Sequence, residues 1–472
     1  MTDSDTTPEG GDGSDTQTDR RHRIRGYRPD RRRMLKTLGA VGTAGLALTA
    51  GCSGSNGGDG GGSSNGDSGS VEVPDSITIV QENVPDTAAL EPLLDDFEEE
   101  TGISAEMTKD PYEVLQEKVS TQLQSNSPDF DVAIYDQYWL GDFVEGGLAR
   151  SLEDRVADSD VIDPDTYFDP VWESTAVYDD SIWSVPFFQY TNAMMYRTDI
   201  LQDEELKANY EGDYAVPETI KEYVDLCGYL TANTDDDFYG AAMQGKRGAP
   251  IHDEYMNYFH GMGGRFVTPD GEVMVDKNGN RETAVEALNV YTDNMNDGAP
   301  EASKSMKFSE SLEILGNGDA FSMLTYNVLY PVLANNTEAG DMLGFELVPG
   351  KSPPIWGWSW GIPANVDEGR AEAAWRFIEW AESFETRKER MLNGGSPTAP
   401  DVLQEDEVVE QNPEFYGKQE ELITNATPWT NVPGTTQAVQ NWGTQLSLAV
   451  SGDKSPEKAI DDGISQVKSA LQ

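Results

Sequence analysis

Alternating β-strand and α-helix signals near the start of the folded region restrict the fold of this chain more than any other feature. An apolar run typical of a buried strand is followed by apolar residues at helical spacing, and the pair of signals then repeats. Such alternation predicts a parallel, doubly wound α/β sheet with helices on both faces, whose ligands lie beyond the carboxyl ends of the strands. The segments are Ile77–Val80 (strand), Leu90–Phe97 (helix), Ile103–Ala105 (strand), Leu115–Leu123 (helix) and Asp131–Tyr135 (strand).

The length of 472 residues exceeds the usual size of one hydrophobic core, so we expect two globular lobes after a processed N-terminus. Apolar residues on one face indicate further helices over 284–295 and 371–378. We expect Trp375 and Trp380 to pack in the core. The dipeptide Asn278-Gly279 is typical of a tight turn rather than of a calcium-binding loop.

The charge balance is strongly acidic, with 33 basic and 85 acidic residues and a formal net charge of −52. Binding to nucleic acid needs basic patches, and the basic cluster of this chain is confined to residues 20–33, so no nucleic-acid partner is expected. Acidity dispersed through every segment resembles that of proteins from extreme halophiles, in which high salt screens self-repulsion, and we expect a haloarchaeal origin. An acidic protein from an ordinary organism is the alternative.

A targeting segment is indicated near the N-terminus. Residues 31–36 read Arg-Arg-Arg-Met-Leu-Lys, and the apolar run Leu38–Ala50 follows directly. This run is too short to cross a hydrocarbon core of roughly 30 Å, so it is typical of a signal peptide. The pair Arg31-Arg32 resembles a twin-arginine signal. We therefore predict that residues 1–51 are a twin-arginine lipoprotein signal peptide.

A lipid anchor is predicted directly after the signal. Leu48–Cys52 resembles a lipobox, whose cysteine becomes the lipidated first residue of the mature protein. The Gly-, Ser-, Asn- and Asp-rich stretch that follows behaves as a flexible coil. Residues 52–75 are thus interpreted as a lipidated Cys52 and a tether, which would hold the protein at the extracellular face of the membrane.

The remaining cysteine and two sequons agree with this location. If Cys52 carries a lipid, Cys227 has no partner for a disulfide, and its place in a predicted helix favours a core residue over a nucleophile. Asn335 and Asn425 each begin an acceptor sequence for glycosylation, a pattern that also occurs by chance.

An ordered set of segments resembles the family 1 extracellular solute-binding proteins of ABC importers, which include maltodextrin-binding proteins. The resemblance covers roughly Val71 to Gln472. In order, the segments look like the first helix entering the second strand, the third strand, the crossing between lobes, a late strand and the return to the first lobe. They are Phe97–Ile103, Ser127–Val132, Ile182–Pro186 with Met195–Asp199, Asn317–Met323, and Trp358–Pro363.

The resemblance implies a two-lobe periplasmic-binding-protein-like fold of type II, in which each lobe is a doubly wound sheet flanked by helices and a hinge of several crossings joins them. Lobe 1 is predicted over 76–187 plus about 350–396, and lobe 2 over 188–349 plus about 397–472. The crossings are expected near Val185–Tyr190, Val348–Pro354 and Leu392–Pro397.

The resemblance also implies a function. We expect a monomer that captures a carbohydrate (a sugar, oligosaccharide or polyol) and delivers it to a membrane permease, without catalysis, cofactor or metal. Other solutes remain alternatives, namely a glycerol phosphate, a peptide or a polyamine. A secreted glycoside hydrolase is a further alternative, although the sequence has no zinc-ligand pattern, nucleophile elbow or phosphate loop. An adhesion protein should show β repeats, and none is visible.

Sugars present hydroxyl edges and weakly apolar faces, so their sites combine aromatic platforms with amide and carboxylate groups. This chain has such residues after predicted strands, at the expected interlobe crossing and in the tryptophan-rich return segment. The predicted ligand-binding residues are Glu82, Asn83, Asp136, Tyr138, Trp139, Gln189, Tyr190, Asn192, Gln244, Arg247, Tyr326, Asn327, Trp356, Trp358 and Trp360.

Several of these residues have a competing structural interpretation. Trp356, Trp358 and Trp360 alternate at strand period and share one face, which favours a cleft over core packing. Asp136 is one acidic residue among many, and its position after a strand is what favours a site. Arg247 is a rare positive charge that could equally serve an acidic ligand.

Overall fold

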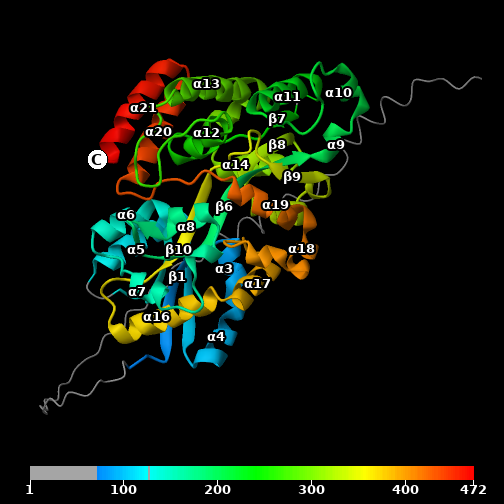
Figure 1. Cartoon of the computed structure of the whole chain (residues 1–472). Helices are drawn as coiled ribbons and strands as arrows, with labels where there is room; N and C mark the ends of the chain where they lie inside the picture. The colour runs from blue at the N-terminus through cyan, green and yellow to red at the C-terminus, as the bar shows by residue number, and fades with distance from the viewer. Residues whose placement is uncertain (1–71, 126–127, 236) are drawn as a thin grey trace, which may run out of the picture. The chain divides into compact units, whose positions relative to one another are not determined.

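The computed structural model describes residues 72–125, 128–235 and 237–472. The predicted signal peptide, Cys52 and most of the tether lie outside the described residues. Within them, the predicted alternation of strands and helices is confirmed from the first strand onward (Figure 1). The strands are β1 (Ser76–Glu82), β2 (Ser104–Asp110), β3 (Val132–Asp136), β4 (Val177–Tyr178), β5 (Ser181–Ile182), β6 (Val185–Arg197), β7 (Tyr239–Ala241), β8 (Ala320–Tyr326), β9 (Leu343–Leu347) and β10 (Ile355–Gly361).

The helices complete the alternation, and a π-helical turn at Asn294–Gly298 continues one of them. They are α3 (Pro85–Leu90), α4 (Leu94–Thr101), α5 (Tyr112–Gln124), α6 (Gln137–Glu145), α7 (Glu153–Ala157), α8 (Asp169–Thr175), α9 (Thr198–Leu201), α10 (Glu204–Asn209), α11 (Ile220–Asn233), α12 (Ala249–Gly261), α13 (Asn280–Asp293), α14 (Phe308–Gly316), α15 (Leu329–Asn336), α16 (Glu368–Ala381), α17 (Phe384–Leu392), α18 (Asp406–Gln411), α19 (Pro413–Thr424), α20 (Thr435–Val450) and α21 (Pro456–Ala470).

The strands of the main sheet form two groups that share β6, while β4 and β5 pair separately. In the first group, β1 pairs in parallel with β2 and with β3, while β10 lies antiparallel between β3 and the first half of β6. In the second group, the latter half of β6 pairs antiparallel with β8 and β9, and β7 runs parallel to β8. The sheet is therefore mixed rather than wholly parallel, because β10 runs opposite to β3 and β6, while β7, β8 and β9 also run opposite to β6.

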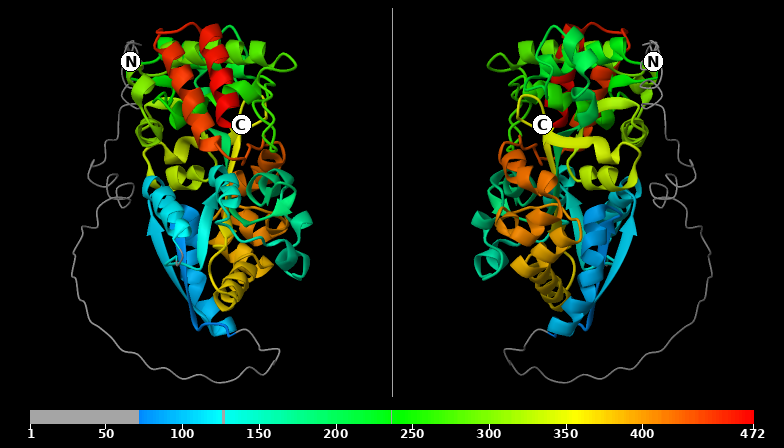
Figure 2. Two further views of the ribbon diagram at one scale, coloured as in Figure 1. Left: turned by 90° about the vertical axis from the view of Figure 1, so that its left-hand side faces the viewer. Right: turned by 90° about the vertical axis from the view of Figure 1, so that its right-hand side faces the viewer.

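Helices cover the sheet through the apolar faces that the sequence predicts. The residues Ala284, Ala287 and Leu288 of α13 are fully buried, as are the small residues of α16, and Trp375 and Trp380 pack in the core as predicted. The C-terminal helices α20 and α21 lie side by side (Figure 2). Before α13, Asn278 and Gly279 have φ values of 53° and 84°, the left-handed conformation that a tight turn requires.

Cys227 is a core residue, as predicted. Its side chain is fully buried on α11, and its thiol donates a hydrogen bond to the carbonyl of Gly240 at 3.3 Å. Burial raises the pKa of this thiol to about 12, so the reactive thiolate is suppressed.

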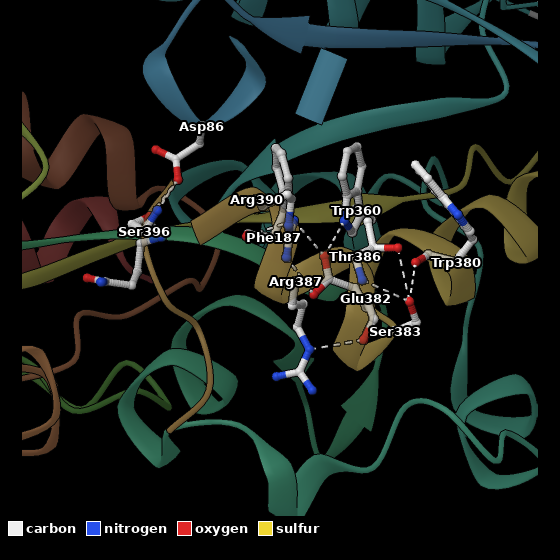
Figure 3. A network of polar contacts seen from close by, with 11 residues as sticks. Asp86, Phe187, Trp360, Trp380, Glu382, Ser383, Thr386, Arg387, Arg390 and Ser396 are labelled. Atoms are coloured by element: carbon white, nitrogen blue, oxygen red, sulfur yellow. Dashed lines mark hydrogen bonds and ion pairs between the residues drawn. The ribbon is translucent and has the colours of Figure 1, made fainter. Parts of the chain in front are cut away.

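A buried ion pair connects α16, α17 and the first strand group (Figure 3). Arg390 donates two hydrogen bonds to Glu382, at 3.0 and 3.2 Å, and its guanidinium lies 4.7 Å from the ring centroid of Phe187. The indole of Trp360 donates to the same carboxylate at 2.8 Å. Both charged side chains are at most 3% exposed, so each charge depends on the other for compensation.

Replacing Arg390 with Met should lower the free energy of unfolding by about 3 kcal/mol, because Glu382 then loses its buried counter-charge. The matched control is Arg376→Met on α16, where the arginine is 46% exposed and pairs with Glu372 at 3.1 Å. Arg376→Met should lower the free energy of unfolding by no more than about 0.5 kcal/mol. Urea unfolding of both variants in the same salt measures the difference, and equal losses would contradict the structural role of the buried pair.

Candidate functional site

The carboxyl ends of β1 and β3 lie at the same edge of the sheet because the two strands are parallel neighbours. β1 ends at Glu82 and β3 ends at Asp136, so two acidic side chains meet at this edge. The second strand group contributes Tyr326, the last residue of β8. Burial and nearby carboxylates, including those of Glu82 and Asp136, raise the pKa of the Tyr326 hydroxyl, which shows that these groups lie close together.

Asp136 is held by the local geometry of the strand-to-helix turn. It is the N-cap of α6, and its Oδ1 accepts a hydrogen bond from the backbone N–H of Tyr138 at 2.9 Å. Its Oδ2 accepts from the hydroxyl of Tyr112 at 2.8 Å. Burial raises the pKa of Asp136 to about 6, although both hydrogen bonds favour the ionised form.

Aromatic side chains line the surroundings of these carboxylates. Trp358, the cross-strand neighbour of Asp136, stacks on Phe188 with ring centroids 4.8 Å apart and contacts Tyr190 at 5.1 Å. The ring centroids of Tyr190 and Tyr326 lie 5.7 Å apart, and those of Tyr326 and Trp356 lie 5.5 Å apart. The rings therefore continue from the first strand group to the second.

Two further contacts extend the aromatic surroundings. The indole N–H of Trp356 donates to the hydroxyl of Tyr138. Trp139 stacks on Tyr112 with ring centroids 5.6 Å apart. Together these contacts attach α5 and α6 to the strand ends.

A third acidic side chain, Asp253, comes from α12. Its Oδ2 accepts a hydrogen bond from Tyr326 at 3.4 Å. Burial raises the pKa of Asp253 well above the usual value, and repulsion from Asp136 adds to that rise. Asp136 and Asp253, from β3 and α12, are thus each more easily protonated than a surface carboxyl.

The structure brings most of the predicted site residues into one cluster. We call it the aromatic–acidic cluster and define it by residues linked through the contacts above, including two that the sequence analysis did not select. Its members are Glu82, Tyr112, Asp136, Tyr138, Trp139, Tyr190, Asp253, Tyr326, Trp356 and Trp358.

Gln189 and Asn327 lie in the backbone junction of β6. Asn327 accepts from the backbone N–H of Thr191 at 3.1 Å and donates to Gln419 at 2.7 Å. Gln189 donates to the carbonyl of Pro397 at 3.2 Å and accepts from the Thr191 hydroxyl at 2.6 Å. Both side chains are fully buried and satisfy backbone groups where β6 changes neighbours.

Trp360 is placed apart from the other two tryptophans of β10. Its ring lies 4.1 Å from Phe187 and 5.2 Å from Phe377 of α16, and its indole donates to Glu382. It shares the strand period of Trp358, but it lies two residues further from the strand ends. Its surroundings are those of a core residue.

The other predicted residues lie beside the cluster or on the surface. Asn192 is buried and donates to Asn257 of α12 at 3.0 Å. Gln244 is buried, and its backbone carbonyl accepts a hydrogen bond from the hydroxyl of Tyr291. Asn83 and Arg247 are exposed.

Tyr112 and Asp253 were missed for different reasons. Tyr112 begins the helix after β2, so the parallel neighbour relation of β2 and β1 is a signal that could have found it. Asp253 lies in the interior of α12 and follows no strand directly. Nothing in its sequence surroundings separates it from the many surface acids.

The described part of the chain has neither a metal-binding cluster nor a membrane-spanning helix. Within residues 72–125, 128–235 and 237–472, no group of His, Cys, Asp and Glu could hold a metal ion. In the same ranges, no helix combines the length and apolar composition needed to cross a bilayer.

The two strand groups share β6, and polar and aromatic residues gather at the strand ends. Residues 81–387 match the family described as bacterial extracellular solute-binding protein. This match spans more than half of the chain, and the chain belongs to that family.

The chain is also similar to individual solute-binding proteins. The erythritol/L-threitol-binding protein of Mycolicibacterium smegmatis is 23% identical over 343 residues, which cover 68% of this chain and 69% of that protein. A solute-binding protein of Agrobacterium radiobacter K84, solved with ribitol, has a TM-score of 0.71 and 23% identity over 84% of this chain and 99% of its own. Maltose-bound MalE3 of T. maritima has a TM-score of 0.71 and 22% identity, and the match covers 84% of this chain and 100% of that one. The fold is thus that of a type II periplasmic binding protein.

The stability of the protein should depend on pH through Asp136. A carboxyl has a pKa of about 3.9 when unfolded, whereas that of Asp136 is about 6 in the folded state. The burial of Asp136 therefore does not lower the free energy of unfolding below pH 4, lowers it increasingly as the pH rises to 6, and lowers it by a constant amount above pH 6. Between pH 4 and pH 7, the free energy of unfolding of Asp136→Asn should rise by up to about 3 kcal/mol relative to that of wild type.

Urea unfolding across this pH range measures the gain. Asp95→Asn, at an exposed position of α4, controls for the loss of a carboxylate from the surface. A difference between Asp136→Asn and wild type that stays constant with pH would contradict the burial of this carboxyl.

Proposed function

We propose that this protein captures a carbohydrate, either a polyol or a sugar, outside the cell and delivers it to the permease of an ABC importer without altering it. The aromatic–acidic cluster is the observation that carries this proposal. Aromatic rings pack against the C–H faces of a sugar or polyol, and carboxylates accept hydrogen bonds from its hydroxyls. The names of the relatives, which include binders of erythritol, ribitol and maltose, support the same ligand class.

In this proposal the ligand lies between the two strand groups and is held by residues of both. Trp358 and Tyr190 supply ring faces from β10 and β6, Asp136 supplies an acceptor from β3, and Asp253 and Tyr326 belong to the other group. Closure around the ligand excludes water and strengthens these hydrogen bonds. The lobe boundaries predicted from the sequence, 76–187 plus about 350–396 and 188–349 plus about 397–472, are part of this proposal.

The proposal includes attachment to the membrane through a lipid on Cys52, after export by the twin-arginine route. The lipobox-like Leu48–Cys52 and the polar tether support it. We further propose a monomer from a halophile, because the net charge of −52 favours a medium of high salt. Measurements on the purified protein therefore belong in molar salt.

A thermal-shift screen tests the ligand class. A ligand that binds only the folded state raises Tm by mass action. We expect a rise with erythritol, ribitol, mannitol or maltose, and none with a peptide or glycerol phosphate. A rise with the peptide or with glycerol phosphate alone would overturn the carbohydrate proposal.

Trp358→Ala should weaken binding of the best carbohydrate from this screen by about 1–3 kcal/mol, since it removes a buried ring face. Trp183→Ala is the matched control, because Trp183 precedes β6 and donates to Tyr178, far from the cluster. Isothermal titration calorimetry measures both affinities. If the two variants bind alike, Trp358 does not contact the ligand.

Cys52→Ser should release the protein from the membrane fraction or leave the precursor unprocessed, because serine cannot accept the lipid. Fractionation and mass measurement of the N-terminal fragment check this. Cys227→Ser, at the buried thiol, controls for loss of a cysteine as such. Membrane association of Cys52→Ser equal to that of wild type would refute the anchor.

A further inference from the structure

A chain of contacts joins two carboxylates of the aromatic–acidic cluster. Asp253 accepts a hydrogen bond from Tyr326, whose ring packs against Trp356. The indole of Trp356 donates to the hydroxyl of Tyr138, and the backbone N–H of Tyr138 donates to Asp136. Asp136 lies at the end of β3 and Asp253 lies on α12. Tyr138 and Tyr326 lie near both, since burial together with the charges of both aspartates raises the pKa of each hydroxyl. Ionisation of both aspartates together is therefore unfavourable until a positive charge lies between them.

No positive side chain of the described residues compensates these two carboxylates. Asp136 accepts its hydrogen bonds from a tyrosine hydroxyl and a backbone N–H, and Asp253 accepts from a tyrosine hydroxyl. Neither forms an ion pair with a described Lys, Arg or His. Arg247, the cation that the sequence analysis considered for an acidic ligand, is exposed.

Buried polar atoms around these carboxylates lack partners among the described residues. They are Oδ1 of Asp253, Oδ1 of Asn192 and the indole nitrogen of Trp358. Asn192 and Trp358 are only 3% and 8% exposed. Asn192 donates to Asn257, which lies one helical turn after Asp253 on α12, so its free acceptor is near that carboxylate. A buried polar atom without a partner is costly. A ligand donor would satisfy the two oxygens, whereas the indole N–H of Trp358 needs an acceptor such as a ligand hydroxyl.

The composition of the region around the two aspartates favours an organic cation over a metal ion. In the described ranges, no set of acidic side chains gathers closely enough to hold a metal. Aromatic rings lie beside these carboxylates instead, since Trp358 is the cross-strand neighbour of Asp136, Tyr326 donates to Asp253, and Tyr190 packs against both rings. Aromatic faces attract ammonium groups, and the attraction increases when water is excluded.

We propose that the preferred ligand is a hydroxylated amine, an amino polyol or amino sugar, whose ammonium group lies between Asp136 and Asp253. This inference rests on the proposed function and narrows it. The hydroxyls of the ligand keep the contacts proposed above, while its ammonium donates to the two aspartates and to the free acceptor of Asn192. A ligand with a carboxylate or phosphate in that place meets repulsion and finds no cation.

Three ligands on one carbon skeleton test the charge preference. Glucitol, glucamine and gluconate differ at a single carbon, which carries a hydroxyl, an ammonium or a carboxylate, and the same three forms of ribitol provide a shorter series. Calorimetry in molar salt should give the tightest binding for the amine, by about tenfold over the neutral polyol. The carboxylate should bind most weakly.

Proton release provides an independent readout. Because burial and mutual repulsion keep the pKa of Asp253 high, an ammonium group should drive its ionisation, and a proton should be released on binding. The dependence of the binding enthalpy on the ionisation enthalpy of the buffer measures this release. Binding of the neutral polyol should release fewer protons.

Asp253→Asn and Asp136→Asn should each reduce the preference for the amine, while Arg247→Gln should leave the whole series unchanged. Equal affinities for the amine and the neutral polyol would overturn this inference and leave the proposed function intact. Tighter binding of gluconate, lost in Arg247→Gln, would overturn it in favour of an acidic ligand. Failure of every polyol and sugar to bind, whatever its charge, would overturn the proposed function and this inference with it.

Discussion

The backbone ladder of β6 is the constraint on which the rest of the structure depends. This strand has 13 residues, all buried apart from the partly exposed Tyr196, and it pairs with β10 along one half and with β8 and β9 along the other. Buried backbone groups must all find partners, so the point where β6 changes neighbours needs side chains to supply them. Asn327 and Gln189 do so. The junction in turn holds Tyr190 and Asn192 at defined positions beside the cluster.

Buried carboxylates are compensated by different groups in two parts of the molecule. Under α16 and α17, Glu382 is compensated by Arg390 and by the indole of Trp360, and the result is a structural ion pair. In the aromatic–acidic cluster, Asp136 is compensated by neutral donors alone. A carboxylate with neutral donors keeps more of its negative potential, which is available to a ligand. This contrast separates the structural acids from the candidate binding acids.

Part of the candidate site could be predicted from the sequence because ligands of doubly wound sheets lie at strand ends. That rule selected Asp136 and Tyr326, which the structure brings together. It also selected Asn327, whose side chain serves the backbone junction, and it could not find Asp253, which comes from the interior of a helix. Strand period grouped Trp358 with Trp360, but period carries no information about depth along the strand. The ion pair beneath α16 decides that Trp360 belongs to the core.

The sequence by itself determined the alternation of strands and helices and the residues at the carboxyl ends of β1 and β3, because both follow from local hydrophobic period and from the geometry of parallel strands. The antiparallel insertion of β10 between β3 and β6 was decided by tertiary structure, because it joins segments far apart along the chain. The same is true of the approach of Asp253 to Asp136. Two carboxylates separated by more than a hundred residues acquire a shared electrostatic environment only when folding excludes water from between them.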